Sequence, residues 1–231
     1  MKKIITLVLM MFIMINTTSY AYSDITDESL KSKIEILSEY NIINGYEDGT
    51  FRPHNQITRS EFCKMIICTT MNEATEIFEQ TFKDVEDGFW AESYIYSAKK
   101  LGIVNGTTEK TFEPHANITN EQAIKMIVCA LGYGEKAVEL GGYPNGYLQV
   151  AESLGIINLD TFDGKKVSTR KEIAEMVYNA LGVDFYFITL NDAGEIEKSK
   201  AESTLREFHE FLKSEPEIDK EFVQEEGNSV G

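Results

Sequence analysis

Cysteine is scarce in this chain of 231 residues, which has only Cys63, Cys68 and Cys129. An odd and sparse set does not supply the disulfide framework of a small exported domain. Cys63 and Cys68 are five residues apart on one expected helix and point to different faces, which disfavours a bridge between them. No C-x-x-C pair and no Cys/His cluster occurs, so neither a metal site nor a redox site is indicated. We interpret the three cysteines as small, half-buried apolar residues.

Basic residues are also few. The chain has 22 Lys and Arg against 38 Asp and Glu, a net charge of -16. Such an acidic chain lacks the electrostatic footprint of a protein that binds nucleic acid or an anionic bilayer. If it binds an anionic polymer, it must do so through local sites that work against the overall field. With 42% hydrophobic residues, the chain can still build a core.

The only long apolar run spans residues 4–15 and is broken by Thr6 alone. Lys2 and Lys3 precede it, and a polar stretch ending in Ala21 follows it. A basic start, a short apolar middle and a small-x-Ala end predict a secretory signal peptide over residues 1–21. We expect cleavage after Ala21 and a mature protein outside the membrane; the rival interpretation is an uncleaved anchor. No Cys follows the run, so a lipoprotein is not indicated.

A stretch from Asn44 to Met65 recurs along the chain. It runs from a Gly-rich turn through an extended F-R-P segment into a helix start. An offset of 61 residues reproduces it, and a fixed offset is the signature of internal repeats. The matched pairs are Asn44-Gly45 with Asn105-Gly106, Thr50-Phe51 with Thr111-Phe112, Pro53-His54 with Pro114-His115, Ile57-Thr58 with Ile118-Thr119, and Lys64-Met65-Ile66 with Lys125-Met126-Ile127.

A third, more divergent copy follows at an offset of 53, in which Leu101 to Asn105 reappears as Leu154 to Asn158. The second helix of each copy is expected to start at a threonine with Glu or Gln three residues later, which is a capping box. The three pairs are Thr58 with Glu61, Thr119 with Gln122 and Thr169 with Glu172.

Beyond Gly182 the repeat pattern stops. Residues 185–190 and 195–198 predict a weak hairpin around the turn at 191–194. A short amphipathic helix is expected over residues 204–212, and an acidic, disordered end from Glu215.

Four motifs together resemble the S-layer homology family. They are F-x-D-V at Phe82 to Val85, W-A at Trp90 and Ala91, N-G-Y-x-D-G-T-F-x-P at Asn44 to Pro53, and I-T-R-x-E-F at Ile57 to Phe62. The resemblance implies a mainly α fold, with three tandem repeats packed as a pseudo-threefold helical spindle and a small C-terminal extension. The expected boundaries are 22–78, 79–134 and 135–182 for the repeats, the last divergent, and 183–231 for the acidic, partly disordered extension.

The family's known role implies a secreted protein of the cell wall or cell surface. By resemblance, grooves between neighbouring repeats bind the secondary cell wall polymer, often through sugars that bear a pyruvate ketal. This is a noncovalent anchor with no catalytic residue, no metal and no cofactor, and we expect a monomer with an internal pseudo-trimer. After signal cleavage no contact with the membrane is expected.

Arg59 and Arg170 follow the threonines of two capping boxes. A cation in the first turn faces the positive end of the helix dipole, so it is poorly placed for helix stability. It is well placed to bind a carboxylate, because free backbone N–H groups and a guanidinium converge there. The alternative is that both arginines pair with neighbouring acids across the repeat packing.

Asn120 takes the arginine's place in the second copy, and it can hydrogen-bond a sugar but supplies no charge. Gly45 and Gly106 are expected in tight turns and could also line a groove, whereas the matching residue in the third copy is Leu159. The sequence therefore predicts the groove lined by Arg59 as the principal site, the one lined by Arg170 as second and the Asn120 position as weakest.

Three further residues complete the candidate site. Trp90 is the only tryptophan and could stack on a sugar ring, although an aromatic residue at a helix start is more often a core anchor. Asp84 and Asp24 precede their helices, where they could meet sugar hydroxyls, but helix capping is the favoured role.

Two other functions compete with wall anchoring. One is a degenerate scaffold that recruits another exported protein through the acidic segment from Glu195 onward. The other is an enzyme, which the sequence disfavours because it shows no nucleophile–base pair, metal set or phosphate loop.

Overall fold

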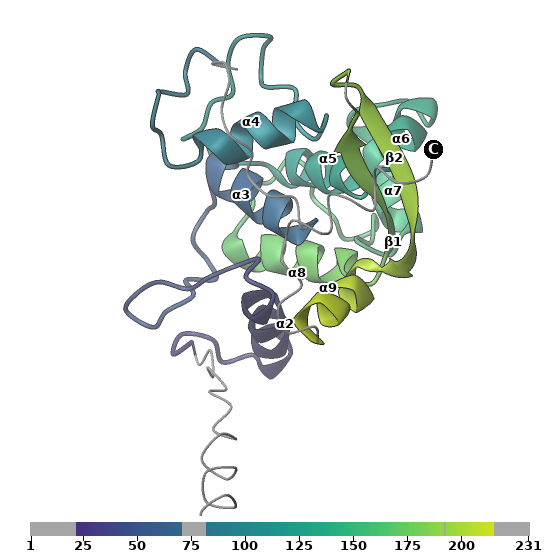
Figure 1. Cartoon of the computed structure of the whole chain (residues 1–231). Helices are drawn as coiled ribbons and strands as arrows, with labels where there is room; N and C mark the ends of the chain where they lie inside the picture. Colours follow the sequence, from purple (N-terminus) through teal and green to yellow (C-terminus); the bar gives the residue numbers. More distant parts are fainter. Residues whose placement is uncertain (1–21, 71–81, 192, 215–231) are drawn as a thin grey trace, which may run out of the picture.

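A computed structural model describes residues 22–70, 82–191 and 193–214 (Figure 1). The predicted signal peptide and the acidic end from Glu215 lie outside these residues. The described chain is mainly helical with one two-stranded sheet, which confirms the expected mainly α content. The elements are α2 (Glu28–Glu39), α3 (Arg59–Thr69), α4 (Glu92–Lys100), α5 (Asn120–Ala130), α6 (Gly134–Glu139), α7 (Asn145–Ser153), α8 (Arg170–Ala180), β1 (Asp184–Leu190), β2 (Ile196–Thr204) and α9 (Leu205–Ser214).

All three predicted capping boxes are present, and those of α3 and α8 have the fuller set of hydrogen bonds. The amide of Glu61 donates to Thr58 Oγ1 at 3.2 Å, and the amide of Thr58 donates to Glu61 Oε2 at 2.8 Å. The threonine hydroxyl also donates to the same carboxylate at 2.9 Å. Thr169 and Glu172 repeat this arrangement at the start of α8. These reciprocal bonds satisfy amides that a helix start leaves without partners, which fixes where α3 and α8 begin.

The box of α5 is weaker, because Gln122 replaces the glutamate. The amide of Thr119 donates to Gln122 Oε1 at 3.2 Å. In the described part of the chain, however, the buried Thr119 Oγ1 has no hydrogen-bond partner. A buried hydroxyl without a partner costs free energy of folding.

We expect Gln122→Glu to raise the free energy of unfolding by about 0.5–1.5 kcal/mol, since a carboxylate can accept from both the amide and the hydroxyl of Thr119. Urea unfolding followed by circular dichroism measures the shift in midpoint at constant slope. Glu61→Gln is the matched control and should lower stability by a similar amount. An unchanged or lower midpoint for Gln122→Glu would contradict this account of the cap.

Helices pair between repeats in a cyclic order. The second helix of one predicted repeat packs against the first helix of the next, so that α3 contacts α4, α5 contacts α7, and α8 returns to α2. The core is continuous across these pairs. Its fully buried members include Ile34 of α2, Phe62 of α3, Ile95 of α4, Ile127 of α5 and Ile173 of α8. The repeats therefore share one core instead of each burying its own.

The segments that lead into α3, α5 and α8 form a closed ring of backbone hydrogen bonds. The amide of Ile118 donates to the carbonyl of Ile57 at 3.1 Å, and the amide of Ile57 donates to Ser168 at 3.4 Å. The amide of Ser168 donates back to Ile118 at 2.9 Å. Each segment donates to one neighbour and accepts from the other, so the starts of the three helices are fixed relative to one another.

The predicted hairpin forms and is longer than expected. Strands β1 and β2 pair antiparallel from Leu190 with Ile196 to Asp184 with Thr204. The hairpin packs on the end of α5, where the amide of Tyr186 donates to the carbonyl of Leu131 at 3.1 Å. The Tyr186 ring also meets Tyr133 edge-on at 5.4 Å.

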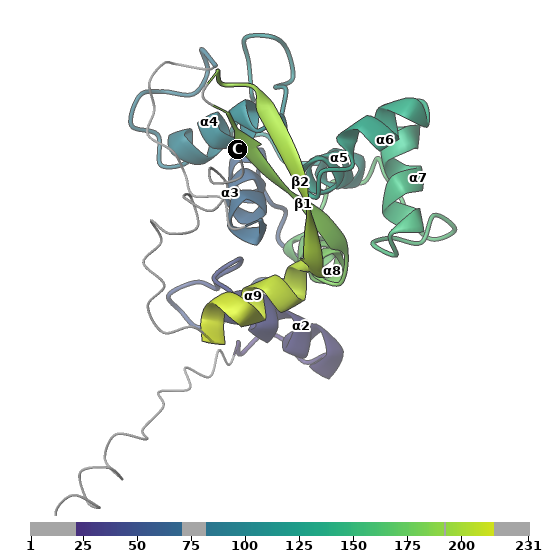
Figure 2. The same ribbon diagram turned by 45° about the vertical axis from the view of Figure 1, so that its right-hand side comes forward.

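Helix α9 confirms the predicted C-terminal helix and lies beside α2 in both ribbon views (Figures 1 and 2). His209 is buried, stacks on Tyr40 at 4.8 Å and bonds the carbonyl of Thr69 at 2.8 Å. Lys213 pairs with Glu39 of α2. Helix α9 is thus folded onto the first repeat helix, whereas most of β2 is exposed.

Candidate functional site

The starts of α3, α5 and α8 each lie against a loop of the neighbouring repeat. In α3, the amides of Arg59 and Ser60 donate to the carbonyls of Ala116 and Pro114 at 2.9 and 3.2 Å. The equivalent amides of α5 donate to Lys166 and Gly164, and those of α8 to Asn55 and Pro53. The expectation of free N–H groups beside the arginines is therefore wrong, because the neighbouring loop already uses the first two amides of each helix.

Three junctions result, which we name by the predicted repeats that they join. The 1/2 junction has Arg59 against the Phe112 loop, the 2/3 junction has Asn120 against the Asp163 loop, and the 3/1 junction has Arg170 against the Phe51 loop.

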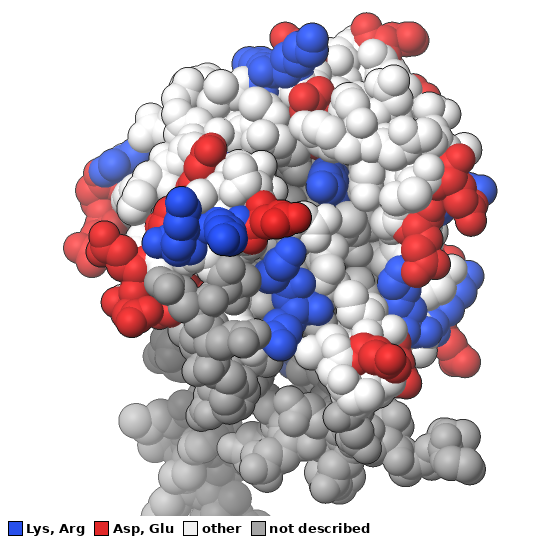
Figure 3. All heavy atoms as spheres, turned by 90° about the horizontal axis from the view of Figure 1, so that it is seen from above, with Lys and Arg blue, Asp and Glu red and all other residues white. Residues whose placement is uncertain are grey.

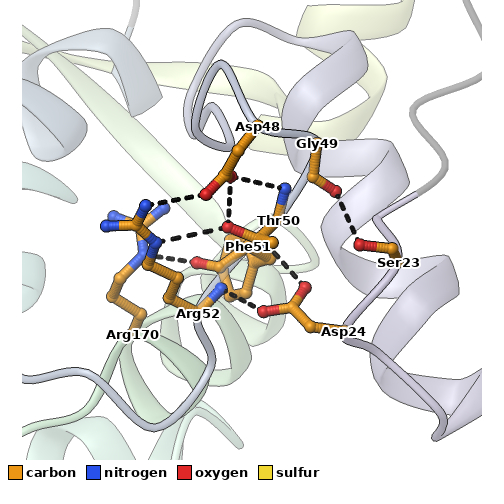
Figure 4. Close-up of polar contacts among 8 residues, drawn as sticks. All are labelled: Ser23, Asp24, Asp48, Gly49, Thr50, Phe51, Arg52 and Arg170. Atoms are coloured by element: carbon orange, nitrogen blue, oxygen red, sulfur yellow. Dashed lines mark hydrogen bonds and ion pairs between the residues drawn. The ribbon is translucent and has the colours of Figure 1, made fainter.

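At the 3/1 junction Arg170 is buried and holds two carbonyls of the first predicted repeat, of which Figure 4 shows that of Phe51. Its Nε donates to Phe51 O at 2.9 Å and its Nη2 to Asn44 O at 2.8 Å. The guanidinium also lies over the rings of Phe51 and Tyr46, at 4.7 and 5.1 Å from the ring centres. Burial lowers the pKa of Arg170 from its ordinary value. The guanidinium contacts carbonyls and rings, and the nearby Glu61 carboxylate opposes part of the pKa shift without forming an ion pair.

Arg59 repeats this geometry at the 1/2 junction. Its Nε donates to Phe112 O at 2.9 Å, and its guanidinium lies 4.7 Å from the centre of the Phe112 ring. Within the described residues neither Arg59 nor Arg170 forms an ion pair. The alternative expectation, that these arginines pair with acids across the repeat packing, is therefore also wrong. Both arginines join repeats through uncharged acceptors.

Asn120 makes the corresponding contact at the 2/3 junction, although its side chain is shorter than that of arginine. Its Nδ2 donates to Asp163 O at 2.9 Å, and its Oδ1 accepts from Ser168 Oγ at 2.7 Å. A hollow of about 320 Å³ lies beside it, lined in part by Phe162, Lys166 and Asn179. Lys166 is paired with Glu172 at 2.6 Å. The polar groups at the 2/3 junction are therefore the neutral amide of Asn120 and a lysine that is already ion-paired.

Asp24 and Asp84 do not cap helices, which corrects the favoured expectation. Asp24 accepts from the amides of Phe51 and Arg52 at 2.8 and 2.7 Å. Asp84 holds the Phe112 loop in the same way, with both distances 2.8 Å. The residues after the two phenylalanines have left-handed backbone, with φ of 58° at Arg52 and 60° at Glu113. Each aspartate thus stabilises a loop conformation that ordinary side chains disfavour.

Gly45 and Gly106 are required by packing. A Cβ on Gly45 would lie 2.1 Å from Tyr22 Cε1, and one on Gly106 would lie 2.6 Å from Phe82 Cε1. The amide of Gly45 also bonds Tyr22 Oη at 3.1 Å. These glycines let the aromatic ring at the start of each repeat lie against the turn, and in the first repeat that turn supplies the Asn44 carbonyl that Arg170 binds.

Trp90 is 53% exposed, so the expectation of a core anchor is wrong. Its ring packs only against Phe89 among the described aromatic residues, at 5.6 Å between centroids. Phe89 in turn meets His115, in the loop that receives α3, edge-on at 5.3 Å. An exposed indole is able to stack on a sugar ring.

The eight predicted residues thus divide among the repeat junctions. Asp24, Gly45 and Arg170 converge on the 3/1 junction. Arg59 and Asp84 meet at the Phe112 loop of the 1/2 junction. Gly106 lies against Phe82 within repeat two, Asn120 marks the 2/3 junction, and Trp90 is at the start of α4.

The sequence prediction missed Tyr46, Arg52 and Glu113. Arg52 and Glu113 are 61 residues apart, so they occupy the same position in the first two predicted repeats. The sequence therefore already showed that the side-chain charge at this position differs between them.

On the face shown in Figure 3, basic and acidic side chains are interspersed and form no continuous basic field. Of the residues that the structure describes, no three His, Cys, Asp or Glu side chains group as metal ligands. The three cysteines are free and lie buried or half-buried, as expected. In the described segments no helix has the length and apolarity needed to cross a bilayer.

A family model, described as the S-layer homology domain, matches residues 21–63 and 81–124. These two stretches are S-layer homology domains. The S-layer homology domain is an anchoring module of the cell surface. Their presence, together with relatives that are cell-wall and surface-layer proteins, indicates a secreted protein of the cell wall or cell surface.

Three relatives illustrate the kinds of protein that carry similar domains. The chain is 30% identical over 161 residues to the middle cell wall protein of Brevibacillus brevis, covering 68% of this chain and 15% of that protein. It is 31% identical over 123 residues to the cellulosome-anchoring protein of Acetivibrio thermocellus, covering 51% and 27%. An exoglucanase of Acetivibrio thermocellus is 30% identical over 179 residues, covering 71% and 16%. The chain thus spans less than a third of the length of these relatives.

Proposed function

We propose that this S-layer homology protein anchors noncovalently to the cell wall by binding an anionic, pyruvate-ketal-bearing secondary wall polysaccharide at the junctions between its repeats. The observation that carries the proposal is the pair of buried guanidinium groups, Arg59 and Arg170, whose charge no ion pair neutralises within the described residues. A pyruvate ketal places one carboxylate on an otherwise neutral sugar, and a guanidinium fork suits a carboxylate.

The proposed architecture is three repeats packed as a pseudo-threefold spindle in a monomer. The closed ring through Ile57, Ile118 and Ser168 supports it, as does the return of α8 to α2. The ring also supports residues 135–182 as a third repeat, because Ser168 and Arg170 hold the places that Ile57 and Arg59 hold in the first. Nothing in this role requires a reaction, so we propose that the chain itself is not an enzyme.

Cosedimentation of the full chain with purified wall sacculi tests the proposal. We expect sedimentation with intact walls, release by added free wall polymer, and loss of sedimentation when the polymer has been chemically removed from the walls. Equal sedimentation with stripped walls would contradict polymer binding.

A truncation after Ser214 separates anchoring from the scaffold alternative. This truncation keeps α9, which packs on α2 through His209 and Lys213, and removes the acidic residues 215–231. An anchor should keep its wall sedimentation after this truncation. Loss of sedimentation would favour the scaffold.

A further inference from the structure

The helices α3, α5 and α8 are held together at their starts by the backbone ring through Ile57, Ile118 and Ser168. Each helix has 11 residues, so its end lies roughly 16 Å from its start. The last carbonyls of a helix have no hydrogen-bond partner within the helix. At each of these three ends, one such carbonyl accepts a hydrogen bond from the segment of residues 183–214.

Two of the donors in this segment are backbone amides. The amide of Tyr186 in β1 donates to the carbonyl of Leu131, the C-cap residue of α5, at 3.1 Å. The amide of Arg206 in α9 donates to the carbonyl of Leu181, the C-cap residue of α8, at 2.7 Å. The hairpin and the helix that follows it therefore bind the ends of two different helices.

The third donor is a buried side chain. His209 Nε2 lies 2.8 Å from the carbonyl oxygen of Thr69, the last residue of α3. Because a carbonyl oxygen can only accept, the imidazole carries a proton on Nε2. The same ring stacks on Tyr40, the C-cap residue of α2, at 4.8 Å. Helix α9 thus joins the ends of α2, α3 and α8.

The hairpin and α9 form one continuous layer across the repeats. In Figure 2 the tip of the hairpin lies beside α4, and α9 lies beside α2. A Cβ on Gly102, just after α4, would lie 3.0 Å from Ile196 Cδ1 in β2. The rings that join the hairpin to α9 have centroids 4.9 to 5.7 Å apart and belong to Phe185, Phe187 and Phe208. Phe185 is also a buried member of the core that the repeats share.

Strand β1 approaches the end of α5 so closely that a side chain at residue 132 would not fit. A Cβ on Gly132 would lie 2.6 Å from Tyr186 Cβ and 2.9 Å from Tyr186 Cδ2. The hydroxyl of Tyr133 donates to the carbonyl of Asp184 at 3.0 Å. Both backbone and side-chain atoms therefore fix β1 on this helix end.

We infer that residues 183–214 form a clamp that opens as one unit and fixes the ends of α3, α5 and α8 relative to one another. The ring fixes the starts of the same helices, so each helix is held at both ends. The clamp lies outside the two stretches that match the S-layer homology model. The folding unit of this chain therefore continues past Gly182, where the repeat pattern stops, to Ser214.

Amide hydrogen exchange of the full chain tests the clamp. Amides of a unit that opens as a whole share one free energy of opening, so Tyr186 and Arg206 should be equally protected in the wild type. His209→Phe keeps an aromatic ring against Tyr40 but loses the donor to Thr69. We expect this substitution to speed exchange of both amides by about tenfold, although His209 bonds neither acceptor.

The last turn of α5 reports whether the clamp holds a helix end. The amide of Leu131 donates to the carbonyl of Ile127 at 2.9 Å within that turn. Its exchange should also accelerate in His209→Phe, because the open clamp no longer restrains α5. An unchanged rate for Leu131 would show that the segment rests on the helices without holding their ends.

Tyr186→Ala tests the clamp from its other end. Loss of the ring contact with Tyr133 should speed exchange of the Arg206 amide by about threefold or more. Phe211→Ala is the control, because this α9 ring is 54% exposed and its removal should leave both amides unchanged. Melting temperatures confirm that each variant is folded.

Independent docking of the hairpin and α9 predicts a different result. His209→Phe would then accelerate Arg206 and leave Tyr186 unchanged, and Tyr186→Ala would leave Arg206 unchanged. Either result would overturn the clamp. The measurement uses no wall polymer, so its outcome is independent of the proposed function.

Discussion

Replacing Arg170 with alanine is expected to lower the free energy of unfolding by about 2–4 kcal/mol. The change removes the donors to the carbonyls of Phe51 and Asn44. Both acceptors lie in the first predicted repeat. The substitution therefore weakens the contact between the third predicted repeat and the first. The void left beside the Phe51 ring adds to the cost, because buried contacts are not replaced by water.

Chemical denaturation of the full chain measures this loss, with Arg170→Lys and Lys171→Ala as controls. A lysine keeps the charge but cannot reproduce two donors in a planar fork, so Arg170→Lys should lose more than half as much stability. Lys171 lies in the same helical turn with a partly exposed side chain, and its removal should cost little. A cost below 1 kcal/mol for Arg170→Ala would show that the arginine does not hold the junction.

Gly106→Ala is the second substitution with a large expected effect, also about 2–4 kcal/mol. Gly106 has φ of 81°, and its Cβ would lie 2.6 Å from the carbonyl oxygens of Thr108 and Thr111 as well as from the Phe82 ring. Backbone atoms cannot move aside as a flexible side chain can. The turn must therefore open, and the Phe82 ring must leave its buried place.

Gly49→Ala provides the comparison that isolates the crowding. Gly49 has a similar φ of 76° with no atom within 4 Å of an added Cβ, so it reports the cost of the left-handed conformation alone, about 1 kcal/mol. Thermal melts of both variants should therefore show a markedly larger drop for Gly106→Ala. Equal drops would mean that the contacts with Phe82 and the two carbonyls contribute nothing.

Features contained within one repeat could be predicted from the sequence. The helix starts at Thr58, Thr119 and Thr169 follow from local capping chemistry, and the resemblance of the repeated motifs to the S-layer homology family implied the mainly α fold. The hairpin and α9 also rest on local signals, namely a turn after an apolar run and an amphipathic period.

Features that join distant residues could not be predicted. The acceptors of Arg170 lie more than a hundred residues before it, and no spacing within a repeat reveals which neighbour's loop a helix start contacts. For the same reason, the sequence could not show that the first amides of these helices donate to a loop of the neighbouring repeat, and the expectation of free amides was wrong. Trp90 was misjudged for a different reason, because an aromatic residue beside a helix start has the same local pattern whether it is buried or exposed.

The docking of α9 on α2 determines how the protein would respond to tension. A pulling force that enters at Ser214 acts first on α9, whose side-chain contacts with Glu39, Tyr40 and Thr69 can separate one after another. The ring through Ile57, Ile118 and Ser168 would instead have to rupture as a unit, because its three hydrogen bonds close on themselves. We therefore expect α9 to detach from α2 before the junctions open.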